Sequence, residues 1–242
     1  METAESPTLE MSSDKNLETS RLVSQNSNSK PSYINLVSNF FALVFLVIIC
    51  YYSFDNGISL FSFHPIFMSV GWMLIMTSAI NAVTPGDLAT EWMPIRLRSA
   101  RHWVLQVIAG IIITVGFLVI ISNKIINNSA HFTTYHGKFG LASYIFMLVT
   151  MLGGIGALYS LKLKQYLPPI YTKLLHASVG LLTFCLGITS ISLGLFSSWG
   201  SKKGEVFQYI GLSIVLLVML FTVLRPTLKV YFRLRERLDN VN

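Results

Sequence analysis

Long apolar stretches separated by short polar segments dominate this sequence. Between its Asp, Glu, Lys and Arg residues lie six charge-free apolar runs, at residues 31–54, 56–86, 102–123, 139–161, 174–201 and 206–224. A helix that crosses a bilayer needs about 20 consecutive, mostly apolar residues. Each run is long enough, so the pattern predicts an all-α integral membrane protein with six transmembrane helices embedded in a lipid bilayer.

The two ends of the chain differ from this pattern. Residues 1–32 are rich in Ser, Asn, Glu and Lys and show no apolar periodicity, which predicts a disordered tail. They also lack the basic start followed directly by an apolar stretch that marks a signal peptide. We therefore divide the chain into this tail, a six-helix domain at 33–225 and a basic C-terminal tail at 226–242.

The distribution of positive charge predicts the orientation. With six spans, both tails share one side of the membrane with the loops after the second and fourth helices. That side holds 14 of the 18 Lys and Arg residues, and the opposite side holds 4. The positive-inside rule then places both tails in the cytosol. Because the cations lie between apolar runs, a membrane surface accounts for the net charge of +7, and we expect no nucleic-acid partner.

Four of the five histidines lie near the start of a predicted span: His64, His102, His136 and His176, in helices two to five respectively. Ionisable side chains inside membrane spans are costly, and they usually mark function. Because successive helices alternate in direction, His64 and His136 lie near the outer face, whereas His102 and His176 lie near the inner face. In a central four-helix bundle of helices two to five, each pair offers two imidazoles from opposite walls. That arrangement suits the two axial positions of haem iron and predicts two haems.

Small residues follow the histidines at helical spacing. Helix four reads His136, Gly140, Ser143, Met147, Thr150, Gly154, and helix five reads His176, Gly180, Thr183, Gly187, Ser190, Gly194. In helix two the same steps give His64, Met68, Gly71, Ile75, Ser78 and Ala82. Such faces can accommodate a flat macrocycle or can serve close helix packing. Pro65 also predicts that His64 caps the start of helix two.

Two other classes of membrane protein also carry histidines in their spans, and the sequence fits them less well. Respiratory cytochrome b and the NADPH-oxidase-type reductases place two histidines about four turns apart on one helix, and no predicted helix here does so. A non-catalytic histidine-bearing protein, such as a metal-ion carrier, stays open as the alternative. Metal conduction normally uses carboxylates or thiolates along the spans. None of the 11 acidic residues lies inside a predicted span, which argues against it.

Four motifs contain the histidines: FSFHP at 61–65, RHW at 101–103, HFTTYHG at 131–137 and KLLHASVG at 173–180. With these motifs, residues 33–225 resemble the cytochrome b561 family, in particular its short b561 domain-containing protein 2 branch. The resemblance implies two b haems held by His64 with His136 and by His102 with His176. It also implies an ascorbate-dependent transmembrane oxidoreductase, which takes electrons from cytosolic ascorbate and passes them to monodehydroascorbate or a ferric chelate. Endomembranes, such as the endoplasmic reticulum or vesicles, are the implied location, and a homodimer is compatible with the sequence.

Ascorbate is an anion at neutral pH, so its site should contain cations. Arg98, Arg101 and Lys173 lie close in sequence to the inner histidines and are the predicted donor contacts, although ordinary positive-inside anchoring would also explain them. On the opposite side His131 and Lys138 flank His136 and are candidate acceptor contacts or plain loop residues.

Overall fold

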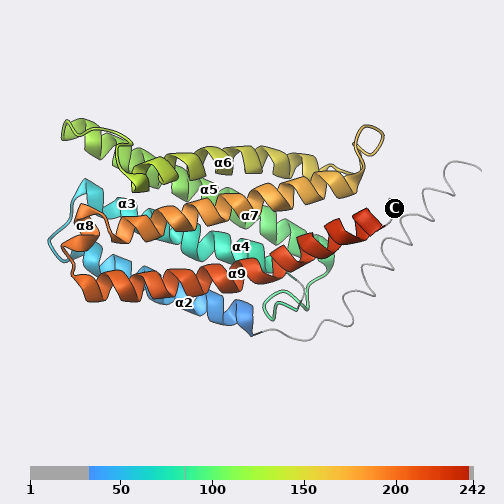
Figure 1. The fold of residues 1–242 in the computed structure, drawn as a ribbon, viewed down its shortest axis with the longest axis horizontal. Helices are drawn as coiled ribbons and strands as arrows, with labels where there is room; N and C mark the ends of the chain where they lie inside the picture. Colours follow the sequence, from blue (N-terminus) through green and yellow to red (C-terminus); the bar gives the residue numbers. More distant parts are fainter. Residues whose placement is uncertain (1–32, 85, 240–242) are drawn as a thin grey trace, which may run out of the picture.

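The computed structural model describes residues 33–84 and 86–239, and it confirms an all-helical fold with six membrane-spanning helices (Figure 1). The predicted disordered tail at 1–32 lies outside the described residues. The spans are α2 (Ile34–Phe54), a composite second span, α5 (Ile95–Ile126), α6 (Tyr135–Leu158), α7 (Pro169–Leu195) and α9 (Glu205–Asp239). A short helix, α8 (Ser198–Ser201), lies between α7 and α9.

The second span is not one regular helix. It consists of α3 (Leu60–Met68), the π-helix η1 (Ser69–Ile75) and α4 (Met76–Ala82). The N-cap is Ser59, whose side chain accepts a hydrogen bond from the Ser62 amide in a capping box. The prediction that His64 caps this helix is therefore wrong. Ser59 satisfies free amides at the helix start, and Pro65 is accommodated one turn further into the helix.

Several helices extend beyond the charge-free runs that predicted them. Helix α5 begins at Ile95, before the three arginines that precede His102, and α7 begins at Pro169. Helix α9 continues through most of the predicted basic tail and reaches Asp239, with Pro226 inside it. Absence of charge marks the apolar segment of a helix, but a helix can continue past it, where charged side chains are solvated.

The helices pack as a bundle with two distinct ends. One end, called the α8 end, carries residues 55–59, 127–134 and 196–204. The other, called the tail end, carries residues 83–84, 86–94 and 159–168 together with the C-terminal turns of α9 (Figure 1). Helices α2 and α9 lie side by side along one flank, where the Ser38 and Thr222 hydroxyl groups hydrogen-bond at 2.8 Å. Near the α8 end the ring centres of Tyr52 and Phe207 lie 4.6 Å apart, with the ring planes tilted by 58°.

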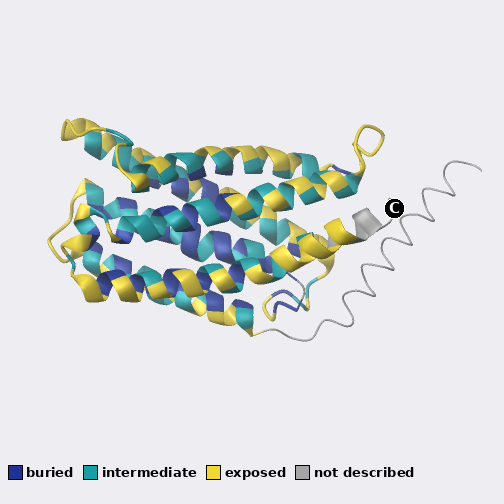
Figure 2. Cartoon of the chain, in the orientation of Figure 1, coloured by how far each residue is buried: buried dark blue, intermediate teal, exposed yellow. Residues whose placement is uncertain are grey.

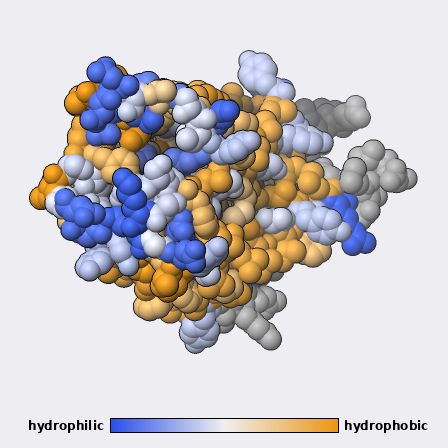
Figure 3. All heavy atoms as spheres, turned by 60° about the vertical axis from the view of Figure 1, so that its left-hand side comes forward, coloured by the Kyte–Doolittle hydropathy of each residue, from blue (hydrophilic) through white to orange (hydrophobic). Residues whose placement is uncertain are grey.

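The outer flanks are apolar, as a lipid-facing surface requires. Exposed residues run along the outward sides of the helices, while buried residues collect on the sides that face one another (Figure 2). Figure 3 shows polar residues gathered at the α8 end and apolar residues covering the flank behind it. The fully buried layer in the middle of the bundle includes Trp72, Ile113, Met147 and Phe184. The chain is an integral, multi-pass membrane protein.

Candidate haem-binding site

The structure brings the four histidines together in the two pairs that helix alternation predicts. The ring centres of His64 and His136 lie 6.2 Å apart, with an angle of 77° between the ring planes. The ring centres of His102 and His176 lie 6.3 Å apart, with the planes at 85°. The first pair lies toward the α8 end and the second toward the tail end, and we call them the outer and inner pairs.

Backbone carbonyls hold three of these rings in place. The Nδ1 atom of His64 lies 3.0 Å from the Gly116 carbonyl oxygen, that of His102 lies 2.8 Å from Ala79, and that of His136 lies 2.8 Å from Ser190. A carbonyl oxygen only accepts, so each Nδ1 carries the proton and donates it. The Nε2 lone pair is then free to bind a metal, and a histidine that binds a metal usually donates its other ring N–H to a carbonyl in this way.

The hydrogen bonds to the histidines stay within two helical hairpins, and in the first hairpin they are reciprocal. The second span and α5 form one hairpin, and each holds the histidine of the other through Gly116 and Ala79. Helices α6 and α7 form the second hairpin, in which Ser190 of α7 holds His136. The buried Nδ1 of His176 lies toward the Thr150 carbonyl of α6, without a hydrogen bond of normal geometry. Each histidine pair therefore joins one hairpin to the other.

The spacing of the rings fits haem iron. Two imidazoles on opposite sides of one metal ion, each bonded at about 2.0 Å through Nε2, have ring centres about 6 Å apart. Both pairs match this separation without further movement. Each pair supplies two ligands, the number that haem iron takes from a protein, whereas a structural zinc ion requires four. In the described residues no three His, Cys, Asp or Glu side chains gather into a metal-binding group.

A large cavity adjoins the outer pair. It has a volume of about 610 Å³ and is lined by both histidines, by apolar and aromatic side chains and by small residues of α7. Its walls include Met68, Trp72, Phe117 and Tyr144. Phe117 and Tyr144 stack with ring centres 4.4 Å apart and planes nearly parallel. This mostly apolar, preformed space is the kind of site that holds a flat macrocycle.

Several glycines on the predicted small faces support side-chain rings directly. A Cβ atom on Gly194 would lie 3.1 Å from Cε1 of His136, and one on Gly154 would lie 3.3 Å from Cε1 of His176. A Cβ atom on Gly187 would lie 2.3 Å from Trp72, so that indole rests on the α7 backbone. Gly194 and Gly154 thus provide space for the imidazoles themselves, and Gly187 provides space for the tryptophan that closes the outer cavity.

At the tail end the three predicted donor contacts have different environments. Arg98 is buried and its guanidinium binds the Glu91 carboxylate at 3.3 Å and the Met93 carbonyl at 2.9 Å. Its charge is already neutralised, which argues against direct contact with an anion. Arg101 is half-buried next to His102, and Lys173 is exposed on α7, so these two are better placed to meet a soluble donor.

Arg98→Ala is expected to destabilise the protein by about 2–3 kcal/mol. The Glu91 carboxylate would lose its ion-pair partner, and the backbone carbonyls that accept from the guanidinium would lose their hydrogen bonds. The loop at 86–94 should also become sensitive to protease. Thermal unfolding in detergent and limited proteolysis measure the two effects. Arg96→Ala is the matched control, since Arg96 lies two residues earlier in the same helix and is exposed. Equal behaviour of the two variants would contradict the assigned role of Arg98.

At the α8 end the two predicted acceptor contacts also have different environments. His131 is half-buried and lines the large cavity, with its ring 5.9 Å from that of Phe132. Lys138 is exposed, and its ammonium lies 5.8 Å from the Tyr135 ring centre. Lys124, which sequence reasoning did not single out, lines the cavity and donates to the Ala130 carbonyl at 2.6 Å. In the sequence, the position of Lys124 at the end of the third apolar run, which is the last turn of α5, could have indicated a place in this cavity.

Comparison with known proteins agrees with this geometry. The family model for eukaryotic cytochrome b561 matches residues 63–201, which contain all four paired histidines. The chain is 36% identical over 143 residues to mouse transmembrane reductase CYB561D2 and 35% identical to the cattle and human proteins of that name. These alignments cover 59% of this chain and 64% of each relative, just under two thirds of their length. The chain belongs to the cytochrome b561 family.

Proposed function

We propose that this protein carries electrons across its membrane, from ascorbate in the cytosol to an acceptor on the opposite side, using two b haems. The observation that supports this most strongly is the presence of two histidine pairs, one toward each end of a membrane-spanning bundle, each spaced for one iron. Haem bound at each pair would supply a one-electron carrier near each face. The mouse, cattle and human relatives are named transmembrane reductases, which supports the same class of activity.

The residues of the chain would have three tasks in this reaction. The four imidazoles bind iron through Nε2, and the carbonyls of Gly116, Ala79 and Ser190 fix their orientation. The mostly apolar walls of the outer cavity exclude water. At the tail end, Arg101 and Lys173 attract the ascorbate monoanion, which loses one electron and one proton and leaves as monodehydroascorbate.

The acceptor gains one electron on the other side of the membrane. A ferric chelate would leave as the ferrous chelate, and a monodehydroascorbate radical would return to ascorbate after taking up a proton. The excess of cations at the tail end favours a cytosolic tail end, and hence a donor site there. The proposal includes an endomembrane location, which rests on the family resemblance, and a homodimeric state, which is compatible with the sequence.

The decisive experiment is an absorption spectrum of the purified protein, followed by reduction in vesicles. We expect a Soret band, two haems per chain, and sharp α and β bands after ascorbate is added. Vesicles loaded with ferric chelate or with monodehydroascorbate then identify the acceptor. A colourless protein would contradict the proposal and favour a metal-ion carrier or another non-catalytic histidine-bearing protein.

Arg101→Gln and Lys173→Gln are each expected to raise the KM for ascorbate about fivefold, because one nearby charge in a hydrated site contributes about 1 kcal/mol. Steady-state reduction by external ascorbate, with the tail end facing the medium, measures the change. Lys164→Gln is the control, because Lys164 is exposed in the same end of the bundle and lies away from the inner pair in sequence. An unchanged KM in both variants would place the donor elsewhere.

A further inference from the structure

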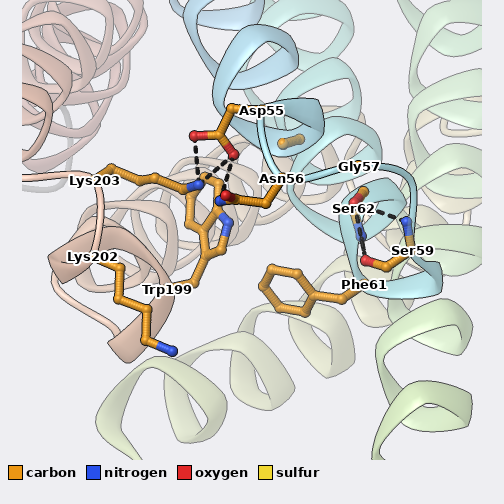
Figure 4. A pocket seen from close by; sticks show the side chains of 10 residues that line it. Asp55, Asn56, Gly57, Ser59, Phe61, Ser62, Trp199, Lys202 and Lys203 are labelled. Carbon is orange, nitrogen blue, oxygen red and sulfur yellow. Dashed lines mark hydrogen bonds and ion pairs between the residues drawn. The ribbon is translucent and has the colours of Figure 1, made fainter.

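A second cavity of about 230 Å³ opens at the α8 end, between the turn that joins α2 to α3 and the segment around α8 (Figure 4). It is lined by residues of both segments, among them Ser53, Asp55, Phe61, Trp199, Lys202 and Lys203. A water molecule occupies about 30 Å³ of liquid, so the space holds several waters or one small organic molecule. The histidines, His131 and Lys138 do not line it.

This cavity shares a wall with the large cavity beside the outer pair. Phe61 and Trp199 line both spaces, and their ring centres lie 6.0 Å apart. The Phe61 ring centre is also 6.3 Å from that of His64. A molecule in the small cavity would therefore lie one aromatic layer away from the outer pair.

The charges around the cavity leave one cation available. Lys203 donates to both carboxylate oxygens of Asp55, at 2.5 and 2.7 Å, and its side chain is only 6% exposed. Asn56 also donates to Asp55 at 2.9 Å. Lys202 is exposed, and it makes no ion pair within the part of the chain that the structure describes. Figure 4 shows its ammonium pointing away from Asp55. The lining thus has a net charge of about +1, which favours an anion.

One hydroxyl in the lining has no hydrogen-bond partner. Ser53 is 5% exposed, and its Oγ is buried without a partner among the described residues. A buried polar group without a hydrogen bond is unfavourable, and it usually indicates a missing water, ion or ligand. A carboxylate or hydroxyl oxygen that enters the cavity could pair with this group.

We propose that this cavity binds a small anion rich in carboxylate and hydroxyl groups, and that it is where an anionic metal chelate docks to receive its electron. The docking role rests on the proposed function, whereas anion binding does not. Lys202 binds a carboxylate, Ser53 binds an oxygen, and Phe61 with Trp199 separates the chelate from the outer pair. One electron, supplied by ascorbate on the other face, reduces the ferric ion to the ferrous ion. No covalent bond forms or breaks in this transfer.

Binding of gallium citrate to the full chain in nanodiscs tests the site, because gallium is not reduced. With no electron donor present, quenching of tryptophan fluorescence or calorimetry gives the Kd. Lys202→Gln should raise the Kd about fivefold through loss of one nearby charge. Ser53→Ala should raise it about tenfold through loss of a hydrogen bond to a charged group, and should leave the thermal unfolding temperature unchanged, because its hydroxyl has no partner in the protein.

Lys162→Gln is the matched control, since it makes the same charge change at the tail end and should leave the Kd unchanged. In vesicles, Lys202→Gln should raise the KM for ferric citrate about fivefold, with an unaltered kcat. The proposal is overturned if Lys202→Gln and Ser53→Ala both bind gallium citrate like the unaltered chain. It is also overturned if Lys138→Gln weakens binding and Lys202→Gln does not. If the protein holds no haem but its gallium citrate affinity depends on Lys202, the anion site stands and the proposed electron transfer fails.

Discussion

His102→Ala is expected to reduce the haem content from two per chain to one and to abolish reduction by ascorbate. The imidazole of His102 faces that of His176 at the tail end, and its Nδ1 donates to the Ala79 carbonyl, which leaves the Nε2 lone pair available. With that ring removed, His176 alone could not hold haem in six-coordinate form. Pyridine haemochrome absorbance per chain measures the loss, and rapid mixing with ascorbate measures the rate.

The pairing makes this prediction specific. His176→Ala should remove the same haem as His102→Ala, and His64→Ala and His136→Ala should both remove the other. His131→Ala is the control, because His131 lines the outer cavity without facing another histidine, and it should keep both haems. Two haems per chain in either inner-pair variant would show that the pairing is incorrect.

Gly187→Val is expected to destabilise the protein by about 1–3 kcal/mol or more, the usual cost of overpacking a well-filled core. The indole of Trp72 lies against the Gly187 backbone, with a Cβ position only 2.3 Å from its ring atoms. Trp72 is 3% exposed and anchored in η1, so it cannot move aside without shifting the second span. Thermal unfolding in detergent should show a clear drop, and the outer cavity should lose haem affinity.

Two further variants separate this clash from a general effect of changing a glycine. Gly156→Val changes the same residue type in α6, where no atom lies within 4 Å of the added Cβ, and it should cost little. The double variant Trp72→Ala with Gly187→Val should lose less stability than the two single variants do in sum, because the shorter side chain at position 72 leaves room for the valine. If the double variant is as unstable as the sum of the two single variants, the contact between these residues does not cause the loss.

Much of the architecture could be predicted from the sequence, because the membrane imposes simple rules. Charge-free runs of the right length predicted six spans, and the structure has six. Alternation of helix direction predicted which histidines face each other, and the ring centres of both pairs lie about 6 Å apart. The resemblance to the b561 family, drawn from four motifs, is confirmed by the family model over residues 63–201.

Other features depend on three-dimensional contacts that no local pattern encodes. The predicted face of helix two assumed regular 3.6-residue spacing and included Gly71 and Ser78. The π-helix changes that spacing; Trp72 lines the cavity, Gly71 packs on Ile113, and Ser78 hydrogen-bonds to Asn39 of α2. Arg98 and Arg101 look equivalent in sequence, yet only Arg98 has a carboxylate seven residues earlier that folds back onto it.

The hydrogen bonds that hold three of the histidines each lie within one hairpin, and this has a consequence for the assembly of the protein. Each hairpin can insert into the bilayer before any porphyrin is present, and His64, His102 and His136 can already be oriented then, because the carbonyl that holds each of them belongs to its own hairpin. Haem bound at the two histidine pairs, as proposed above, would then join the two preformed hairpins. Cofactor supply would thus govern the final step of assembly, and helix insertion would not depend on it.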